Sequence, residues 1–405
     1  MAEGMALTDE QLDAIARVEA RLAEAREAVL VGPAGSGKTT LLREMIGRLA
    51  ASGRDVVLAA PTGKAAVRLA RATGREATTL HRRIYRAIDD DETEQGTGQL
   101  QFSQPRAATG EGAVLVVDEA SMVGTQLYGD VMAHLAAGSA VLWVGDREQL
   151  EPVEDRWGPD LTSPTAALAT VHRHAAENPV LAYATAIREG RGAAWRREWP
   201  NTDERVRFRS EPLDAVTAWA AEAAADGRDA AVVTWTHQVR ERINAGVRER
   251  MGLQGPLAPG DKVLVRMNSE PVGVMNGELF TVERVHPTEM FDRAVLVLSL
   301  AGLSREVRVF TEHLNDRGRG VWATRKQVSA RRWDRYRFLH LWHGHALTVH
   351  SAQGSQWSDV AFVVDGALLR QARTDPDGVR RLVYTAVTRA SERLVVFDLV
   401  DGLGG

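Results

Sequence analysis

The feature that most constrains this chain is a glycine-rich turn between an apolar stretch and a run of helix-forming residues. Residues 29–40 read VLVGPAGSGKTT, and residues 32–39 match the spacing G-x-x-x-x-G-K-[ST] throughout. Glycines let the backbone turn tightly, so that its N–H groups point at phosphate oxygens. The helix that follows adds its positive N-terminal end. The pattern therefore predicts a buried strand, a phosphate-binding loop and a helix of an α/β fold.

Individual residues of this loop have predicted roles. Lys38 is expected to reach the β- and γ-phosphates of a nucleotide, and Thr39 to place its hydroxyl on Mg²⁺. The alternative is a glycine-rich turn with an incidental lysine, which the flanking strand and helix patterns disfavour. The predicted nucleotide contacts in the loop are Gly32, Pro33, Ala34, Gly35, Ser36, Gly37, Lys38, Thr39 and Thr40.

Seven further apolar runs are followed, like the first, by loops and helical stretches. They are DVVLAAPTG, AVLVVDEAS, AVLWVGD, AAVVTWT, ALTVHSAQG, VAFVVDG and RLVVFDL. Several show no polar alternation, which is typical of strands buried on both faces of a parallel sheet. Eight such strands exceed one small domain, and the chain has 405 residues. We therefore expect two α/β domains.

Two stretches interrupt this pattern. Residues 85–112 contain the acidic run DDDETE and a Gly/Gln-rich part, which suggest a small hairpin or loop, with Phe102 as the best aromatic candidate for its tip. Residues 260–345 contain short β-like pieces split by turn residues, which suggest a small β-barrel. The predicted domains are residues 1–84 plus 113–158 and residues 159–259 plus 346–405, with the insertions at 85–112 and 260–345.

Composition excludes several classes of protein. The chain has no cysteine, which rules out disulfides, thiolate nucleophiles and cysteine zinc sites. Its N-terminus lacks the basic and apolar regions of a secretory signal. No apolar run approaches the roughly 18 residues that suggest a membrane span. A cytoplasmic protein with no membrane partner is expected, and the net charge of −4 alone says nothing about nucleic acid.

Acidic and polar residues follow two of the predicted strands. Asp118 and Glu119 end AVLVVDEAS, where two carboxylates are costly to bury unless a cation shares the site. Asp118 is expected to hold Mg²⁺, directly or through water, and Glu119 to polarise the attacking water. Alternatively, the two acids cap the next helix. Gln149, in VLWVGDREQLEPV, is suited to sensing a γ-phosphate, unless it is part of a plain turn.

Two isolated arginines follow apolar segments, Arg173 in TVHRHAAENP and Arg389 in VYTAVTRASERL. A planar, permanently charged guanidinium suits the charge of a phosphoryl-transfer transition state. A surface ion pair is the alternative for each.

Together these motifs resemble those of superfamily 1 helicases of subgroup B, the RecD-like and phage Dda-like group. The resemblance covers residues 7–398. Its anchors, in chain order, are LTDEQ, GPAGSGKTT, APTGKAA, TTLHRRI, VVDEAS, GDREQLEPV, HRH, LTVHSAQGSQW and YTAVTRA.

The resemblance implies two RecA-like P-loop NTPase domains, each a parallel sheet flanked by helices, with a pin-like hairpin insertion and an SH3-like β-barrel insertion. ATP would lie between the domains, with Arg173 and Arg389 reaching its γ-phosphate from the second domain. Gln11 would contact the adenine, unless it is simply an exposed glutamine. Gly354 and Gln356 would also line the nucleotide site. Tyr384 lies in the same motif as Arg389 and could be a core aromatic residue.

The resemblance also implies single-stranded DNA crossing both domains. The residues carried over as DNA contacts are Thr62, Lys64, Thr79, His81, His350 and Ser351. For the two histidines the alternative is a structural role. The sequence departs from the family pattern at Ser351, where a lysine is frequent, at Gln356, where a glutamate is frequent, and at His174, where a glutamine is frequent.

Residues 317–337 (RGRGVWATRKQVSARRWDRYR) hold eight lysines or arginines against one acid, interleaved with aromatics. This composition suits nucleic-acid contact. It equally suits an exposed edge of the β insertion with its tryptophans packed inward, and the sequence does not separate the two interpretations.

The expected function is an ATP- and Mg²⁺-dependent DNA helicase that moves 5′-to-3′ on single-stranded DNA and opens forked duplexes, working as a monomer in replication, recombination or repair. Three alternatives stay open: a translocase that displaces proteins without unwinding, a nucleic-acid-binding subunit with an idle ATPase, and an unrelated P-loop kinase. The last leaves APTGKAA and HSAQG unexplained.

Overall fold

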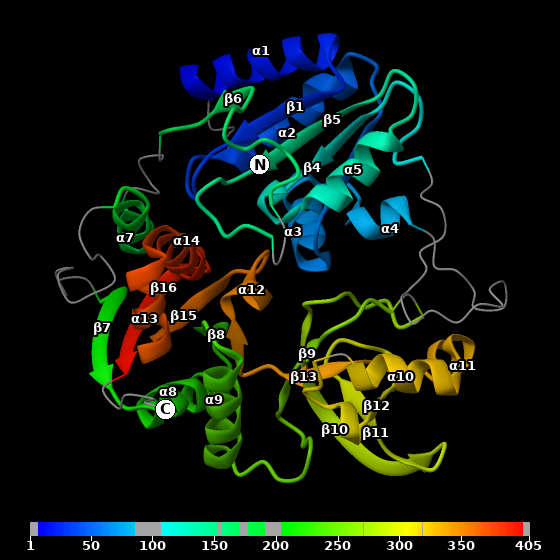
Figure 1. The fold of residues 1–405 in the computed structure, drawn as a ribbon, viewed down its shortest axis with the longest axis vertical. Coiled ribbons are helices and arrows are strands. Elements are labelled where there is room, and N and C mark those ends of the chain that lie inside the picture. The colour runs from blue at the N-terminus through cyan, green and yellow to red at the C-terminus, as the bar shows by residue number, and fades with distance from the viewer. Residues whose placement is uncertain are drawn as a thin grey trace. The chain divides into compact units, whose positions relative to one another are not determined.

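The computed structural model describes residues 7–85, 107–152, 156–170, 177–190, 204–269, 271–317 and 319–399 (Figure 1). These residues form two compact units. The first comprises the described residues up to 190 together with residues 380–388, and the second comprises residues 204–379 and 389–399. Within the described part of the chain, no helix is both long and apolar enough to cross a membrane.

A six-stranded sheet forms the centre of the first unit. Its strands lie in the order β3-β2-β4-β5-β1-β6, and every pair is parallel. Their bounds are β1 (Glu27–Val31), β2 (Val56–Ala60), β3 (Ala77–Thr79), β4 (Val114–Val117), β5 (Ala140–Gly145) and β6 (Ala166–Ala167). Because β6 pairs with β1, this sheet continues past the expected domain boundary at residue 158.

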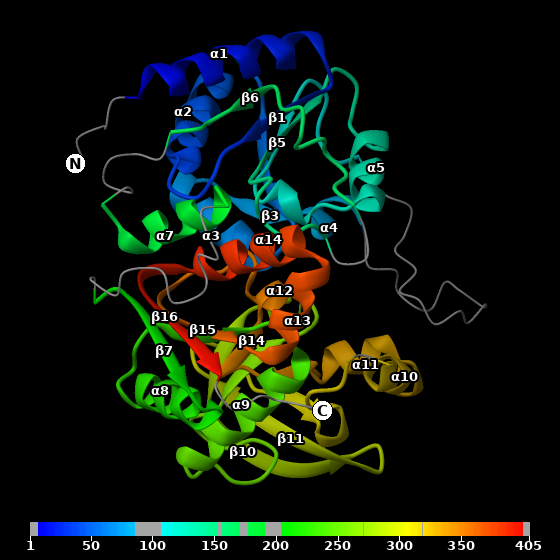
Figure 2. The same cartoon turned by 60° about the vertical axis from the view of Figure 1, so that its left-hand side comes forward.

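Helices bury both faces of this sheet. Leu30 packs on the face covered by α1 (Asp9–Glu24) and α2 (Lys38–Ala51), whereas Val29 and Val31 pack on the face that contacts α4 (Leu80–Ile84) and α5 (Thr125–Ala133). Figure 2 shows β1 and β5 between α2 and α5. Burial on both faces explains why the strands are continuously apolar. The unit also contains α3 (Gly63–Thr73), the 3₁₀ helix η2 (Ala120–Met122) and α7 (Pro179–Arg188).

A second parallel sheet lies in the second unit, with strand order β14-β8-β15-β16-β7. Its strands are β7 (Val206–Glu211), β8 (Ala230–Thr234), β14 (Ala346–Thr348), β15 (Trp357–Val364) and β16 (Ala390–Leu399). One face packs against the adjacent helices α8 (Leu213–Ala225) and α9 (His237–Arg250) (Figure 1). The helices α12 (Val349–Ala352) and α13 (Gly366–Thr374) follow β14 and β15 in this unit, whereas α14 (Pro376–Val387) lies mostly in the first unit. All eight strands expected from the apolar runs are therefore confirmed.

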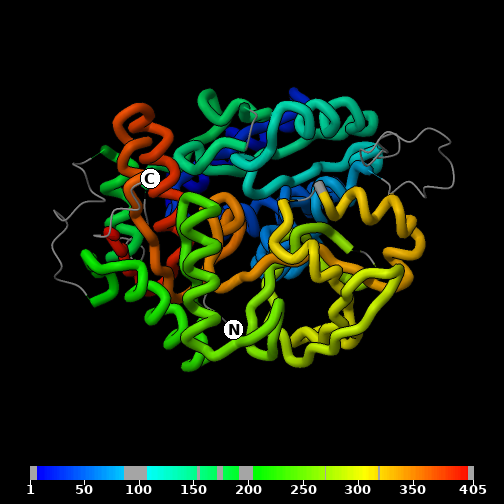
Figure 3. Tube along the Cα trace, turned by 60° about the horizontal axis from the view of Figure 1, so that its bottom comes forward, coloured from blue at the N-terminus to red at the C-terminus, as the bar shows by residue number. Residues whose placement is uncertain are grey.

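The second unit also contains a five-stranded antiparallel sheet with its own apolar core, in the order β12-β11-β10-β9-β13. Its strands are β9 (Lys262–Val265), β10 (Leu279–Met290), β11 (Arg293–Leu300), β12 (Val307–Phe310) and β13 (Leu341–His343). Figure 3 traces this part of the chain in yellow-green and yellow. Strands thus occupy residues 260–345 as expected, while closure into an SH3-like barrel stays a prediction.

The basic segment at residues 317–337 is helical rather than a β edge. It forms α10 (Arg319–Val328) and α11 (Ala330–Arg335), which follow the 3₁₀ helix η3 (Thr311–His313). Trp333 is buried in a core with Phe310 and Phe338, and Val321 and Val328 join the same core. The apolar residues therefore anchor the helices. Residues 86–106 of the proposed hairpin at residues 85–112, including Phe102, lie outside the described residues.

Candidate nucleotide and polyanion sites

The predicted phosphate loop connects β1 to α2 in the first unit. Gly35 and Gly37 adopt φ of 81° and 77°, values that only glycine reaches without strain. Gly37 is the N-cap of α2 and provides no side-chain hydrogen bond to the first turn of the helix. The N-terminal amides of α2 are therefore left for other acceptors, as an anion-binding helix end requires.

Three features of this loop fit a bound phosphate. The Ser36 hydroxyl is buried and has no hydrogen-bond partner among the described residues. A Cβ atom at Gly32 would lie 2.6 Å from the Ser36 hydroxyl, so a larger residue there would displace that hydroxyl. The Lys38 Nζ donates hydrogen bonds to the carbonyls of Gly32 and Pro33, at 2.6 and 2.9 Å. An ammonium that rests on carbonyls of the loop can move to a stronger acceptor when an anion is present.

Asp118 and Glu119 follow β4 at the carboxyl end of the sheet, where parallel α/β sheets bind ligands. The Asp118 carboxylate accepts a hydrogen bond from the Glu119 backbone N–H, at 2.9 Å. Burial raises the pKa of Asp118, while Arg68 and Lys38 act in the opposite direction. Glu119 has a left-handed backbone, with φ of 56°, and makes no side-chain cap to η2. Helix capping therefore does not explain this acidic side chain.

The Glu119 carboxylate accepts a hydrogen bond from Arg68 of α3, and the same guanidinium lies 3.8 Å from Asp118. The Glu119 side chain is only 8% exposed, against 41% for Arg68. The charge of Glu119 is the main reason that the pKa of Arg68 is raised. The sequence motifs did not single out Arg68.

The turn after β5 contributes Asp146 and Gln149. Asp146 accepts a hydrogen bond from the Tyr384 hydroxyl at 2.7 Å, and burial raises the Asp146 pKa, opposed by the charge of Lys38. The same hydroxyl accepts from the backbone N–H of Ala34 in the phosphate loop, at 3.0 Å. Tyr384 is therefore more than a core aromatic residue. The Oε1 atom of Gln149 is buried and has no hydrogen-bond partner among the described residues.

The residues expected to contact DNA lie at helix starts after strands. Thr62 and Thr79 are the N-caps of α3 and α4, and their hydroxyls accept hydrogen bonds from Ala65 and Arg82. Lys64 lies in the first turn of α3. His81 is exposed in α4, with its ring centroid 5.7 Å from that of Tyr85.

In the second unit, the predicted residues gather around the α12 turn. Ser351 is hydrogen-bonded to the Thr348 N-cap, and burial lowers the pKa of His350. Gly354 has φ of 72°, and Gln356 is exposed. Arg389 is 3% exposed and donates to the Ser355 carbonyl at 3.1 Å, so a surface ion pair is the wrong interpretation of this arginine.

Comparisons with known proteins agree with this arrangement. Residues 6–211 match the family model of an AAA domain, and residues 343–397 match that of the UvrD-like helicase C-terminal domain. The ATP-dependent RecD2 DNA helicase of Deinococcus radiodurans is 31% identical over 408 residues, which cover 96% of this chain and 48% of that protein. The RecD subunit of RecBCD from Mycobacterium tuberculosis is 28% identical, covering 91% of this chain and 66% of that subunit.

The chain belongs to the superfamily 1B helicases. The fold agrees: a crystal structure of a Bacteroides Pif1 helicase with ADP-AlF3 and single-stranded DNA aligns with a TM-score of 0.52 at 18% identity, covering 97% of this chain and 92% of the other. This likeness identifies the two parallel sheets with their helices as RecA-like domains. The chain spans about half the length of RecD2 and two thirds of RecD.

Not every residue expected from the superfamily 1B motifs can be placed. Arg173 and His174 lie outside the described residues. Gln11 is 3% exposed, so it is not the exposed glutamine of the alternative interpretation. Its Oε1 accepts from the Thr8 backbone N–H in a capping box that starts α1, and its contact with adenine stays a prediction.

The helicase motifs do not include a group of side chains in the second unit, in which two arginines and a histidine contact one tryptophan. We call this group the Trp342 cluster (His237, Arg240, Arg266 and Trp342). The guanidinium carbons of Arg240 and Arg266 each lie 4.1 Å from the centroid of the Trp342 ring. The His237 ring meets the same indole edge-on, at 5.5 Å. Cation–π contacts of this kind are favourable, but they do not neutralise the charge.

Arg240 is the most buried cation of the Trp342 cluster, at 1% exposure. Its Nη2 pairs with Glu241 at 3.0 Å, while its Nε and Nη1 have no hydrogen-bond partner among the described residues. Burial and the neighbouring Arg240 lower the pKa of Arg266 to about 10. Buried cations with so little compensation favour the approach of an anion. The elements lie far apart in sequence, so local patterns could not indicate this site.

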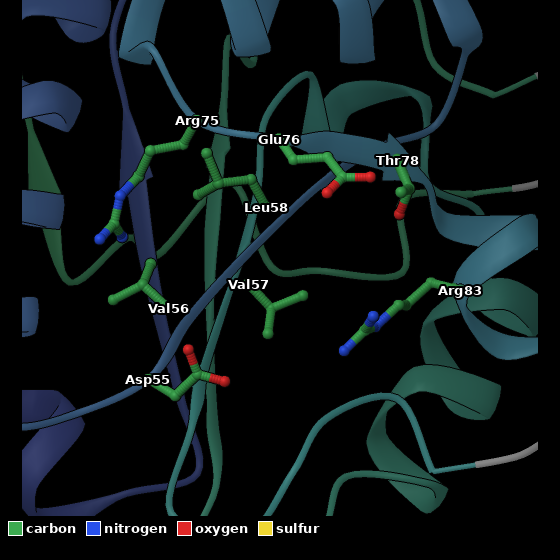
Figure 4. A pocket seen from close by; sticks show the side chains of 8 residues that line it. All are labelled: Asp55, Val56, Val57, Leu58, Arg75, Glu76, Thr78 and Arg83. Atoms are coloured by element: carbon green, nitrogen blue, oxygen red, sulfur yellow. The ribbon is translucent and has the colours of Figure 1, made fainter.

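A pocket of about 390 Å³ lies elsewhere in the first unit, along β2 and the segment that leads into β3. Figure 4 shows its lining side chains, which include Asp55, Arg75, Glu76 and Arg83. Asp55 precedes β2, so this part of the pocket lies at the amino end of the strand, away from the end that bears Thr62. We assign no role in nucleotide binding to this pocket.

Proposed function

We propose that this chain is an ATP-dependent DNA helicase of superfamily 1B that moves 5′-to-3′ along single-stranded DNA and separates forked duplexes. The observation that supports this most strongly is the gathering of loop, carboxylates and glutamine at the carboxyl ends of β1, β4 and β5. The charge of Lys38 opposes the burial that raises the pKa of Asp118 and of Asp146, which supports a position of the ammonium near both carboxylates.

Within the proposed mechanism, Lys38 leaves the carbonyls of Gly32 and Pro33 to bind the β- and γ-phosphates of ATP. Thr39 and Asp118 would hold Mg²⁺, which neutralises charge on the phosphates and takes its remaining ligands from phosphate and water. Among the described residues no group of three or more histidine or acidic side chains is arranged as a metal site. Mg²⁺ itself is usually held by one or two carboxylates together with substrate.

Glu119 would orient and deprotonate the attacking water, and the buried Oε1 of Gln149 would detect whether the γ-phosphate is present. Arg389, and Arg173 if it reaches the same phosphate, would stabilise transition-state charge. An arginine in this role typically raises the rate of hydrolysis by about 10³- to 10⁵-fold. The differing affinity of the DNA contacts in the nucleotide-bound and free states would then turn hydrolysis into movement.

The proposed DNA contacts lie at the N-terminal ends of α3 and α4 in the first unit, and at α12 and the Trp342 cluster in the second unit. Threonine hydroxyls that already accept a backbone hydrogen bond still have a proton to donate to a phosphate oxygen. The Trp342 cluster supplies buried positive charge suited to a phosphodiester. Pif1 helicases share this fold, and their solved structures include a complex with single-stranded DNA and address the unwinding of forked duplex DNA.

A fork-unwinding assay tests the proposal. Forks that carry a 5′ single-stranded tail should be separated with ATP and Mg²⁺, whereas forks with only a 3′ tail should stay paired. ATP hydrolysis without strand separation on either fork would favour the translocase that displaces bound proteins. Tight binding of DNA without hydrolysis would favour the subunit with an idle ATPase.

A further inference from the structure

The proposed water-activating carboxylate is not free to act in this structure. Glu119 is buried, and its carboxylate accepts a charge-assisted hydrogen bond from Arg68. A carboxylate held by a guanidinium is a weaker base, because part of its electron density is already shared with a strong donor. The arrangement therefore opposes the role that Glu119 has in the proposed hydrolysis.

The fold explains how an arginine so far away in sequence reaches Glu119. Strands β2 and β4 are parallel neighbours, with Val56 paired to Val114 and Ala59 to Val117. Helix α3 follows β2 and Glu119 follows β4, so both emerge at the same edge of the sheet. Arg68 is 51 residues from Glu119 in the chain, and it meets the carboxylate because of this strand order.

Arg68 also shares its helix with two of the proposed DNA contacts. Thr62 caps α3, and Lys64 lies one turn before Arg68. Residues four apart lie on the same face of a helix, so Lys64 and Arg68 are neighbours on α3. A phosphate that draws on Lys64 or on the first turn of α3 acts on the element that presents Arg68 to Glu119.

We propose that Arg68 is a positioning residue that restrains Glu119 until DNA binds to α3, and so makes ATP hydrolysis depend on DNA. The proposal rests on the proposed helicase function. Arg68 withdraws when α3 engages a phosphate, and Glu119 then becomes available to the attacking water. The 41% exposure of the Arg68 side chain leaves it room to move, whereas Glu119 at 8% exposure has little.

A purely structural ion pair is the competing explanation. Pairs at exposed surfaces contribute little to stability, on the order of 0–1 kcal/mol. Loss of an ion pair that only stabilises the fold would change the basal rate and the DNA-stimulated rate in the same proportion. Loss of a restraint on Glu119 changes the two rates in different proportions. The ratio of these two rates therefore separates the two explanations.

The test compares wild type with Arg68→Ala, Arg68→Lys and the matched control Arg71→Ala. Arg71 is an exposed arginine of the same helix. Steady-state phosphate release is measured with and without oligo-dT, together with the affinity for the same oligo-dT and the melting temperature. In Arg68→Ala we expect a basal rate raised by about tenfold, the factor that corresponds to about 1.4 kcal/mol, with the DNA-saturated rate unchanged.

Arg68→Lys restores a cation to the position and should return the basal rate towards that of wild type. Arg71→Ala should leave both rates as they are. A basal rate that is unchanged or lowered in Arg68→Ala overturns the proposal, and so does a loss of oligo-dT affinity that accounts for the altered ratio. If wild type itself shows no DNA-stimulated hydrolysis, the proposed helicase function fails before the question about Arg68 arises.

Discussion

Lys38 is the residue on which the proposed hydrolysis depends most directly. Lys38 is half-buried, and its ammonium is hydrogen-bonded to two carbonyls of its own loop. Its charge opposes the rise in the pKa of the partly buried Asp118 and of the buried Asp146. This is a resting geometry for a group that binds an anion. Both of these hydrogen bonds go to carbonyls of the loop, and neither goes to a carboxylate.

Replacing Lys38 with alanine should abolish most hydrolysis. Loss of one donor that stabilises developing charge typically lowers kcat by about 10²- to 10³-fold. Affinity for single-stranded DNA should change little, because the proposed DNA contacts come from other elements. Phosphate release and fluorescence anisotropy with a labelled oligonucleotide measure the two properties. Turnover at the wild-type rate in Lys38→Ala would show that the nucleotide site is wrongly assigned.

Some residues of the site were readable from local patterns and others were not. The residues of the phosphate loop are consecutive in the sequence, and so are the two acids after β4. A strand pattern followed by a turn was therefore enough to indicate each group. Arg68 meets Glu119 only because β2 and β4 are neighbours, and no local pattern contains that information. Tyr384 reaches Ala34 over 350 residues, and its role was missed for the same reason.

At the scale of elements, the antiparallel sheet buries titratable side chains that its apolar strands do not reveal. His340, which precedes β13, donates a hydrogen bond from Nε2 to the Asp316 carbonyl at 2.8 Å. Burial is the main cause that lowers its pKa; Arg266 and His313 act in the same direction, and the carbonyl and charge of Asp316 oppose it. Burial likewise lowers the pKa of His313 and of His343. The folded sheet therefore favours the neutral imidazoles.

The sign of the pH dependence follows from these shifts. A histidine in the unfolded chain takes up its proton near pH 6.5, whereas these histidines in the folded chain do so only at lower pH. Between those two pH values the unfolded chain therefore binds more protons than the folded chain. We expect the free energy of unfolding to fall as the pH drops below about 6.5. Each histidine can contribute about 1.4 kcal/mol per unit of pKa shift.

The variant His340→Asn isolates one of these contributions. Asparagine can still hydrogen-bond to the Asp316 carbonyl but does not titrate, so its stability should depend less steeply on pH between 7 and 5 than that of wild type. Urea unfolding at a series of pH values gives the comparison. Identical slopes for wild type and variant would mean that His340 titrates alike in the folded and unfolded chain.

Element types were predicted better where the apolar pattern was long. Eight of the eleven parallel strands in the described residues were predicted, because burial on both faces leaves continuous apolar runs. The two-residue strand β6 has no such signal. At residues 317–337, Val321, Thr324 and Val328 are buried at helical spacing, yet the many charges mask that period, so the sequence equally suits a β edge.

At the scale of the whole molecule, net charge is a poor guide to the proposed partner. The chain carries −4 overall, yet the Trp342 cluster concentrates cations within the second unit. If that cluster neutralises a phosphate, affinity for single-stranded DNA should fall as salt rises, with a slope of about −0.7 per neutralised phosphate in the log–log plot.

Arg266→Gln should lower the affinity for single-stranded DNA to a similar extent for every DNA sequence. It should also make the salt slope shallower by the amount that about one phosphate contact contributes. Arg305→Gln is the matched control, because Arg305 is an exposed arginine in the turn between β11 and β12 of the same unit. Titrations of labelled oligo-dT at several salt concentrations provide the slopes. Equal slopes for wild type and Arg266→Gln would remove the Trp342 cluster from the DNA path.

The central claim is that ATP hydrolysis in one part of this chain is coupled to the binding of single-stranded DNA. Steady-state phosphate release from the wild-type chain, with Mg²⁺-ATP and with or without saturating oligo-dT, tests it most directly. We predict a slow basal rate and a rate at least about tenfold higher with DNA, a change of about 1.4 kcal/mol in the barrier. Equal rates in the two conditions would contradict the claim.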